Sequence, residues 1–466
     1  MRITIAFFVL LMIYKNTDAQ LRLPSVIASG MVLQQNDSVN IWGWANPDEP
    51  ITINTGWDNQ DYKTTTLNTG KWKRKIKTPA AGGPYTIKIS GWFGPLVLSD
   101  VMIGEVWLCS GQSNMEWNYY AGAKNIKEEL PTCYNKNIRF YHIPRASAAY
   151  PQDDVPATWK VCDSNTLKNF SAVGYFFGKK LNSQLNVPIG LINASWGGTP
   201  AEAWSPADVI SNNPVLAESA NKLTEVPWGP VKRGLLFNGM INPITSFSIA
   251  GAIWYQGEAN VVNSNTYAQL LTSMIDAWRS SWQKQFPFYY VQIAPYNYGG
   301  KDEGALLQAE QTKVMQHPGT GMVVITDLVD SVTNIHPSNK LDVGNRLANW
   351  ALAETYRRDG IAYKSPQIKK AVAVNNNLVL EFKNAPNGLI AKDKKITGFY
   401  IAGNNGEWLP AEAKIEKDKI TVRNKSIPKP LQVSFGFGNT IIGNVFSKEG
   451  LPLCPFRINI NDTIVE

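Results

Sequence analysis

Apolar and polar positions divide the chain into three stretches, of which the first and the last share one pattern. Between residues 21 and 100, short β-rich runs alternate with turn signals such as Asn-Pro-Asp and Ala-Gly-Gly-Pro. These runs are Val39–Trp44, Ile51–Asn54, Tyr62–Leu67 and Tyr85–Ser90. After Tyr356 the same pattern returns in Ala371–Val374, Leu378–Phe382, Thr397–Ile401, Lys419–Val422 and Val433–Phe437. The sequence therefore predicts β-sandwich-like domains over residues 20–100 and 361–466.

The middle stretch, residues 101–360, alternates buried strands with longer helices. The expected strands are Val106–Cys109, Ile138–Ile143, Val187–Ala194, Ile249–Tyr255, Phe288–Ala294 and Gly321–Thr326. The expected helices are Ala172–Leu185, Thr266–Trp282, Ala305–Gln316 and Pro337 to about Tyr356. This alternation predicts an α/β fold in which helices cover both faces of a parallel sheet. Residues 203–232 are irregular, with Pro and Asn, and are expected to form an insertion.

The first 19 residues have the pattern of a signal peptide. A short basic start, Met1-Arg2, precedes the apolar stretch Ile3–Tyr14, and the small residue Ala19 marks the expected cleavage point. No later stretch approaches the roughly 18 continuous apolar residues of a spanning helix. The sequence therefore predicts an exported protein that does not span a membrane. Its compartment would be periplasmic, extracellular or lysosome-like.

Charge and cysteine content argue against two classes of protein, those that bind nucleic acid and those built on a disulfide scaffold. The formal net charge is +8, and removal of Arg2, Lys15 and Asp18 with the signal peptide leaves +7. This charge is mild for 466 residues and no Lys/Arg block stands out, so a nucleic-acid partner is not expected. Four cysteines are too few for a disulfide scaffold. Export would permit a bridge between Cys133 and Cys162, which the sequence leaves open.

Polar turns follow four of the expected strands. They are Ser110–Asn114, Gly197–Thr199, Gln256–Asn260 and Asp327–His336. Because sites in parallel sheets form at the carboxyl ends of the strands, we expect these turns to converge. Ser113 at a strand tip can present its hydroxyl beside free backbone N–H groups. An ordinary Ser/Asn turn would look the same in isolation, but the convergence favours a serine hydrolase without the Gly-x-Ser-x-Gly motif.

His336 is the candidate general base. The chain has three histidines, and His142 in a strand and His317 before a Pro-Gly turn are expected to be structural or surface residues. Pro337 fits the first position of a helix, so His336 would lie at a helix N-terminus. That end of a helix disfavours imidazolium, which would lower the pKa of His336 and keep it neutral at pH 7. The alternative is a capping or surface histidine.

Several long motifs resemble the sialate O-acetylesterase family of SGNH-like carbohydrate esterases. They include GQSNMEW, PIGLINASWGGTPAEAW, WYQGEAN and NIHPSNKLDVGNRLA, in that order along the chain. The resemblance implies a flavodoxin-like catalytic domain that hydrolyses acetyl esters on sugars. It also implies that Ser113 is the nucleophile, His336 the base and Gly198 the donor of an oxyanion N–H group. The turn of Gln256, Gly257 and Glu258 would line the site.

One position departs from that family. Its members usually have an aspartate two residues before the histidine, where this chain has Asn334. An asparagine can orient an imidazole but cannot stabilise imidazolium as a carboxylate does. Three alternatives follow: Asp330 reaches the histidine, the site works as a dyad, or the site is impaired. Asp327 is the other acid nearby.

The expected mechanism needs neither metal nor cofactor, because serine and histidine supply its nucleophile and base. The N–H groups of Ser113 and Gly198, with an amide of Gln256 or Asn260, would hold the oxyanion. Three functions remain open from the sequence. The first is a sialate 9-O-acetylesterase, the second an esterase of acetylated plant polysaccharide such as xylan or pectin, and the third a glycan-binding protein with an impaired site. The sequence predicts no oligomeric state.

Overall fold

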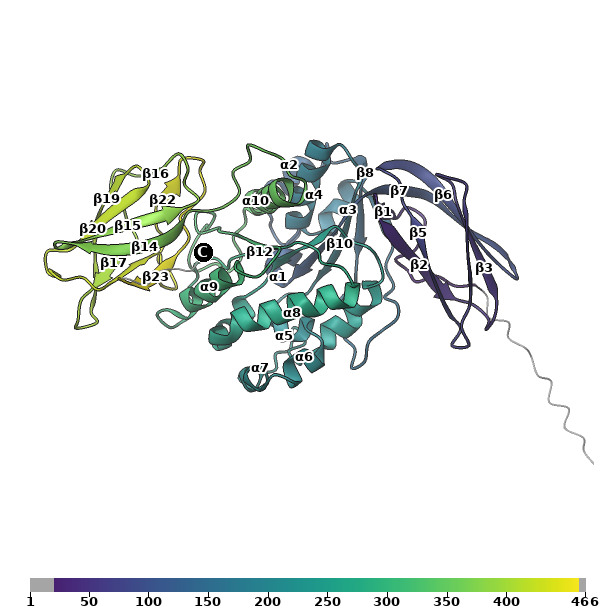
Figure 1. Ribbon diagram of the computed structural model, residues 1–466, viewed down its shortest axis with the longest axis horizontal. Helices are drawn as coiled ribbons and strands as arrows, with labels where there is room; N and C mark the ends of the chain where they lie inside the picture. Colours follow the sequence, from purple (N-terminus) through teal and green to yellow (C-terminus); the bar gives the residue numbers. More distant parts are fainter. Residues whose placement is uncertain (1–20, 461–466) are drawn as a thin grey trace, which may run out of the picture.

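Three bodies follow one another along the long axis of the molecule (Figure 1). The computed structural model describes residues 21–460, and the expected signal peptide lies outside the described residues. A central α/β body lies between an N-terminal and a C-terminal β body. The predicted α/β fold with a parallel sheet and flanking β structure is confirmed.

The N-terminal body is built from short antiparallel strands. Strand β2 (Ser38–Trp44) pairs with β5 (Lys71–Lys77), while β3 (Pro50–Thr55) pairs with β4 (Asp61–Thr65) and β6 (Gly82–Gly91). The alternating pattern of β2 buries Val39 and Ile41 and leaves the residues between them partly exposed. This alternation is typical of a sheet with one face on the core.

Strand β7 (Gly94–Gly111) joins the N-terminal and central bodies. Its first part pairs antiparallel with β6, and its next residues pair in parallel with β1 (Val32–Gln34). Its last part lies at the centre of the parallel sheet, where every residue from Val101 to Gly111 is buried. The expected domain boundary near residue 100 therefore falls inside one continuous strand.

The central sheet has the strand order β13-β12-β11-β7-β10-β8-β9. All neighbours are parallel except β8 and β9. The strands are β8 (Asn135–His142), β9 (Trp159–Cys162), β10 (Ile189–Ser195), β11 (Gly251–Tyr255), β12 (Phe288–Val291) and β13 (Thr320–Val323). The chain leaves β7 for β8, returns to β10 beside β7, and then crosses to β11 on the other side. The carboxyl ends of β10, β7 and β11 are thus adjacent, at the point where ligands bind in open α/β sheets.

Helices cover both faces of this sheet. Within β11, Ile253 and Tyr255 join the core that contains α4 (Ala172–Leu185) and α10 (Lys340–Trp350). Ala252 and Trp254 point the other way, into the core that contains α8 (Tyr267–Trp282) and α9 (Glu303–Val314). Because both faces are buried, the strand is apolar at consecutive positions rather than at alternate ones.

One sequence expectation about the central body needs correction. The insertion over residues 203–232 is not irregular throughout, because it includes α6 (Ala207–Ser211) and α7 (Pro214–Ala220), and α5 (Ala201–Trp204) enters it. Asn213 caps α7 and Pro214 occupies its first turn, a combination that starts a helix even in a short segment. The bridge between Cys133 and Cys162, which the sequence left open, is absent from the described structure, where both cysteines are free and buried.

The C-terminal body is a β-sandwich. One sheet has the order β14-β15-β20-β19 and the other β18-β17-β21-β23. Their strands are β14 (Gln367–Val374), β15 (Asn377–Lys383), β19 (Glu412–Glu416), β20 (Lys419–Arg423), β17 (Phe399–Ala402), β18 (Trp408–Pro410), β21 (Gln432–Phe435) and β23 (Phe456–Asn459), with the pair β16 (Leu389–Ala391) and β22 (Val445–Ser447) beside them. Leu380 from the first sheet and Ile401 and Val433 from the second share one core. Within residues 21–460, no helix is long and apolar enough to cross a bilayer.

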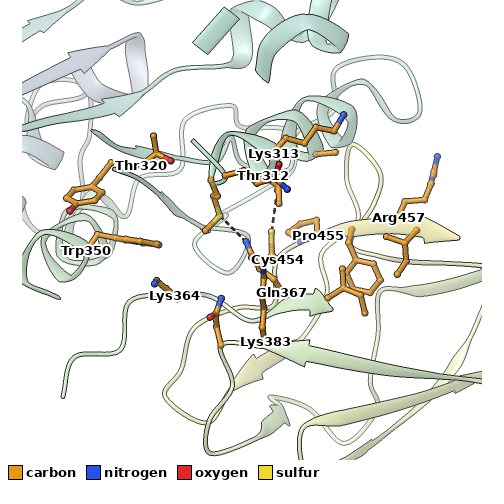
Figure 2. A pocket seen from close by; sticks show the side chains of 18 of the residues that line it. Thr312, Lys313, Thr320, Trp350, Lys364, Gln367, Lys383, Cys454, Pro455 and Arg457 are labelled. Carbon is orange, nitrogen blue, oxygen red and sulfur yellow. Dashed lines mark hydrogen bonds between the residues drawn. The ribbon is translucent and has the colours of Figure 1, made fainter. Parts of the chain in front are cut away.

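A cavity of about 770 Å³ lies between the central and C-terminal bodies (Figure 2). Trp350 and Thr312 line it from the central side, and Gln367 and Cys454 from the other. Contacts across the boundary join the two bodies: Gln367 Nε2 donates to Met315 Sδ at 2.9 Å, and Thr312 Oγ1 lies 3.6 Å from Cys454 Sγ. The cavity wall includes neither Ser113 nor His336.

Candidate active site

Ser113 lies just beyond the carboxyl end of β7. The strand ends at Gly111, and the short helix α1 (Ser113–Glu116) begins two residues later. Gly111 has a φ of +139°, and a Cβ there would lie 2.2 Å from the carbonyl oxygen of Tyr255. Only glycine permits this approach of β7 to β11. The turn leaves Ser113 on the wall of a pocket of about 480 Å³.

His336 approaches Ser113 from the segment between β13 and α10. Its Nε2 lies 2.8 Å from Ser113 Oγ, although the two residues are 223 positions apart in the sequence. When Nδ1 carries the imidazole proton, Nε2 accepts a hydrogen bond from the serine hydroxyl. This is the distance expected between an activated nucleophile and its base. The predicted convergence of these two residues is confirmed.

Burial is the main reason that the pKa of His336 falls to about 4, and the nearby Lys340 lowers it further. The expectation from the sequence that a helix beginning at Pro337 lowers this pKa is wrong. Helix α10 begins at Lys340, after the N-cap residue Asn339. The imidazole is therefore neutral at pH 7 because it is buried and lies near a cation.

The ring of Trp117 stacks on the imidazole of His336. The ring centroids are 4.2 Å apart and the planes are inclined by 20°. Trp117 is the C-cap residue of α1, so the short helix that begins at Ser113 is followed directly by the residue that stacks on the histidine. Stacking restricts the rotation of the imidazole without a hydrogen bond to Nδ1.

Asp330 does not contact the imidazole, contrary to one of the sequence-based alternatives. One carboxylate oxygen accepts from Lys124 Nζ, and the other accepts from the backbone N–H and the hydroxyl of Ser338, both at 2.7 Å. Although partial burial raises the pKa of Asp330, these hydrogen bonds hold it at about 2. Asn334 Oδ1 accepts from the backbone N–H of His336. Among the described residues, none hydrogen-bonds to Nδ1.

Asp327, the other nearby acid, is also occupied. Its two oxygens accept hydrogen bonds from the guanidinium of Arg346, each at 2.7 Å. This bidentate pair fixes the turn after β13 against α10. The other two histidines lie elsewhere: His142 Nδ1 is 3.5 Å from Asn193 Nδ2, and His317 Nε2 is 2.8 Å from Asp276 Oδ1.

The amides of Gln256 and Asn260 lie behind the pocket wall, so the expectation that one of them faces the oxyanion is wrong. Gln256 Nε2 donates to Asn260 Oδ1 at 2.7 Å and to the carbonyl of Thr199 at 3.3 Å. Asn260 Nδ2 donates to Glu202 Oε2 at 2.7 Å, and its Oδ1 accepts from the backbone N–H of Ala201. Both side chains are fully buried. They support the turn after β10 rather than contact a ligand.

Gly198, Glu258 and Gln112 line the pocket beside the Ser113–His336 pair. Gly198 has a φ of +73°, and a Cβ there would lie 2.3 Å from Trp228 Nε1, so the indole covers this glycine closely. Gln112 Oε1 accepts from the backbone N–H groups of Gly257 and Ala259, at 3.4 and 3.2 Å. Because Oε1 faces the turn after β11, Nε2 of the same amide faces away from that turn. No described residue accepts a hydrogen bond from Nε2.

The segment of residues 223–231 forms the opposite wall of the pocket, which is mainly apolar. Its lining residues are Leu223, Thr224, Val226, Trp228 and Val231, and Val262 and Ile335 extend the apolar surface. Trp196 Nε1 donates to the carbonyl of Trp228 at 2.8 Å and holds this segment over the turn after β10. Within residues 21–460, no lysine or arginine lines the pocket.

Sequence reasoning missed several residues of this site, namely Gln112, Trp117, Trp228 and Lys340. Gln112 and Trp117 lie inside the GQSNMEW motif, so their proximity to Ser113 was available as a signal. Trp228 lies in the insertion and Lys340 four residues after His336, and only the packing shows where their side chains lie.

Comparison with known proteins now identifies the family. Residues 103–353, more than half of the chain, match the family described as carbohydrate esterase, sialic acid-specific acetylesterase. The chain belongs to this family. It is a hydrolase, a carbohydrate O-acetylesterase of the sialic acid-specific acetylesterase family.

Relatives cover nearly the whole chain. The sialate O-acetylesterase of Homo sapiens is 29% identical over 433 residues, covering 84% of this chain and 82% of that protein. The Mus musculus enzyme of the same name is 27% identical and covers 87% of each chain. A carbohydrate acetylesterase from Xanthomonas citri has a similar structure, with a TM-score of 0.87 and 33% identity over 94% of this chain and 99% of that one. All three bodies of the present chain therefore have counterparts in that esterase.

Proposed function

We propose that this protein is a serine esterase that removes O-acetyl groups from carbohydrates, with Ser113 as nucleophile and His336 as base. The observation that carries the proposal is the 2.8 Å distance between Ser113 Oγ and His336 Nε2 at the edge of a pocket. Membership of a carbohydrate esterase family supports the ester as the bond that is cleaved.

In the acylation step, Ser113 Oγ attacks the acetyl carbonyl while His336 Nε2 takes the hydroxyl proton. The tetrahedral intermediate collapses when His336 returns this proton to the departing sugar oxygen, which leaves an acetyl-serine. Water then attacks the acetyl-serine with His336 again as base, and acetate and the free serine form. The pKa of about 4 keeps His336 able to accept a proton through the neutral range.

Three donors would hold the oxyanion. Ser113 and Gly198, which line the pocket, would supply their backbone N–H groups, and Gln112, another lining residue, would supply its side-chain amide. Because Gln112 Oε1 is fixed by two N–H groups of the β11 turn, its Nε2 is the part of the amide that remains for a ligand. We assign Gln112 the place that the sequence analysis gave to Gln256 or Asn260.

His336 works in this proposal without a carboxylate partner. The face of Trp117 orients the ring, and solvent or the substrate stabilises Nδ1–H. A dyad of this kind loses part of the stabilisation that a carboxylate gives to imidazolium. The pair Ser113 and His336 would then be the catalytic unit, with Asp330 and Asn334 as residues that shape the loop.

Sialic acid O-acetyl groups, including those at the 9-position, are the first substrate class. The names of the mammalian relatives, sialate O-acetylesterase, support this class. Recognition of sialic acid would require a partner for its carboxylate. Nearby backbone N–H groups or the hydroxyl of Thr224 would have to supply it, since the described lining includes no cation.

Neutral acetylated sugars, as in plant xylan or pectin, are the second class, and the pocket lining favours them. Its apolar wall and the half-exposed indole of Trp228 suit a sugar ring without a charge. Trp228 lies over Gly198, so a ring stacked on the indole would present its ester near the oxyanion donors.

Acetate release from a panel of O-acetylated sialosides, acetylated xylan and acetylated pectin tests the proposal. We expect the Ser113→Ala variant to lose at least about a thousandfold in kcat while its thermal unfolding stays unchanged. The matched control is Ser183→Ala on α4, whose hydroxyl only contacts the carbonyl of Lys180. A folded parent that binds the glycans but releases no acetate would instead support the third function, a glycan-binding protein with an impaired site.

We also propose that the protein is exported and cleaved near Ala19. The basic start and short apolar stretch support export. N-terminal sequencing of the natively produced protein checks this, and an intact Met1 on the mature chain would contradict it.

A further inference from the structure

A fully buried lysine lies behind the Ser113–His336 pair. Lys340, the first residue of α10, has no exposed side-chain surface. Its Nζ donates to Asn114 Oδ1 at 2.6 Å and lies 5.2 and 5.9 Å from the ring centroids of Tyr255 and Trp117. Lysine is almost never fully buried without a partner. The mechanism proposed above gives this cation no role, so its position calls for another explanation.

Asn114 connects this lysine to both catalytic residues. An ammonium group only donates hydrogen bonds, so it fixes Oδ1 of Asn114 toward Lys340 and Nδ2 away from it. Nδ2 then donates to Glu258 Oε1 at 2.6 Å and to the carbonyl of Ile335 at 3.1 Å. Asn114 follows Ser113 and Ile335 precedes His336 in the chain. The amide therefore ties the backbone of the nucleophile turn to the backbone of the histidine loop.

We propose that Lys340, acting through Asn114, is a positioning residue that holds His336 in register with Ser113. This inference rests on the function proposed above and deepens it. A carboxylate at Nδ1 normally orients a catalytic histidine. Here no described residue hydrogen-bonds to Nδ1, and the buried chain Glu258–Asn114–Lys340 fixes the loop instead. Lys340 also lies against Trp117, the residue that stacks on the imidazole.

The charge of Lys340 also affects the pKa of His336, which can be measured separately from activity. The titratable groups around it are Glu258 at the start of η3 (Glu258–Thr266), Asp330 and His336 on the loop before α10, and Tyr255 at the end of β11. Burial lowers the pKa of Lys340 to about 7, while Glu258 and Asp330 raise it in part. The lysine is thus a cation in the acidic range, where it opposes protonation of His336.

The first experiment compares the parent with Lys340→Met in kcat and KM for 4-nitrophenyl acetate. We expect kcat to fall about tenfold or more, with KM changed less than about twofold, because the contacts with the ester remain but the base is misplaced. The matched control is Lys179→Met, a half-exposed lysine of α4 that pairs with Glu129, and it should keep the parent values.

The second experiment measures the imidazole titration of His336 by NMR in a Ser113→Ala background, with and without Lys340→Met. We expect the pKa to move upward from about 4 toward the ordinary value of 6.5 when the cation is removed. A lysine that merely fills space would leave this titration unchanged.

A third variant keeps the test decisive if Lys340→Met alone unfolds the protein. Glu258→Gln with Lys340→Met removes both buried charges, so no uncompensated ion remains. The positioning role is wrong if this double variant folds, keeps the parent kcat and, in the Ser113→Ala background, leaves the titration of His336 as it is in Ser113→Ala alone. If Ser113→Ala itself retains activity, the proposed function fails instead, so the two failures are distinguishable.

Discussion

Asn334 accepts a hydrogen bond from the backbone N–H of His336, at 3.0 Å, and not from its ring. A side chain two residues before a histidine can thus shape the loop without orienting the imidazole. The same is true of Asp330, whose oxygens are occupied by Lys124 and Ser338. Asn334 and Asp330 therefore act on the loop that carries His336, and Trp117 stacks on the ring.

Replacing Asp330 tests whether this carboxylate shapes the loop without orienting the imidazole of His336. We expect Asp330→Ala to lower kcat/KM less than about tenfold, far from the roughly 10⁴-fold loss that follows when an orienting carboxylate is altered. The reason is that the variant loosens the loop at Ser338 but removes no partner of the imidazole. Asn334→Asp should be tolerated because its oxygen can still accept from His336 N–H.

Comparison of kcat/KM for Asp330→Ala, Asn334→Asp and the parent shows whether either side chain orients the imidazole. A loss of a thousandfold or more in Asp330→Ala, in a folded protein, would mean that the carboxylate reaches Nδ1 during turnover. Asp327→Ala is not a suitable control, because it removes both contacts to Arg346.

The stacking of Trp117 on His336 makes a second prediction. Trp117→Ala removes the surface that restricts the imidazole, and a small displacement of a catalytic group costs up to about a hundredfold in rate. We therefore expect a tenfold to hundredfold loss of kcat, within that range, and a much smaller loss in Trp117→Phe, which keeps an aromatic face. The exposed Trp92 of the N-terminal body supplies the control, Trp92→Ala. Equal losses in the Ala and Phe variants would argue against stacking as the cause.

The low pKa of His336 makes a third prediction, about pH. A base must be neutral, so activity is lost as the pH falls through its pKa. Because burial and Lys340 lower this pKa to about 4, the acid limb of kcat/KM should lie near pH 4 and not near the ordinary 6.5. The pH profile from 3.5 to 8 measures this, with circular dichroism at each pH to confirm folding. An acid limb near pH 6.5 would show that the free enzyme exposes its imidazole to water.

The sequence alone predicted the elements whose ends are set locally. Helix α4 has the predicted bounds, since the Ser171 side chain accepts from the N–H of Gly174 at its start and Asn186 adopts a left-handed conformation at its end. Ser113 and His336 were predicted because both follow parallel strands whose carboxyl ends must meet. Local signals failed where distant residues decide the outcome. Lys124, 206 positions away in the sequence, donates a hydrogen bond to the carboxylate of Asp330. Nothing in the sequence around either residue indicates that pairing.

The role of Gln112 gives the last prediction. Its Oε1 is held by the N–H groups of Gly257 and Ala259, so Nε2 is the part of the amide that remains for the proposed oxyanion contact. The amides of Gln256 and Asn260 cannot take this place without breaking their buried hydrogen bonds.

We expect Gln112→Ala to lower kcat by roughly 10²–10³-fold, the loss typical of one oxyanion donor, with little change in KM because the donor acts on the transition state. Gln112→Glu should be at least as impaired, since a carboxylate would repel both the oxyanion and the carbonyl dipole. Steady-state kinetics on one acetyl ester, with thermal unfolding as the check on folding, measures both variants. A folded Gln112→Ala protein with the parent kcat would leave only the N–H groups of Ser113 and Gly198 as oxyanion donors.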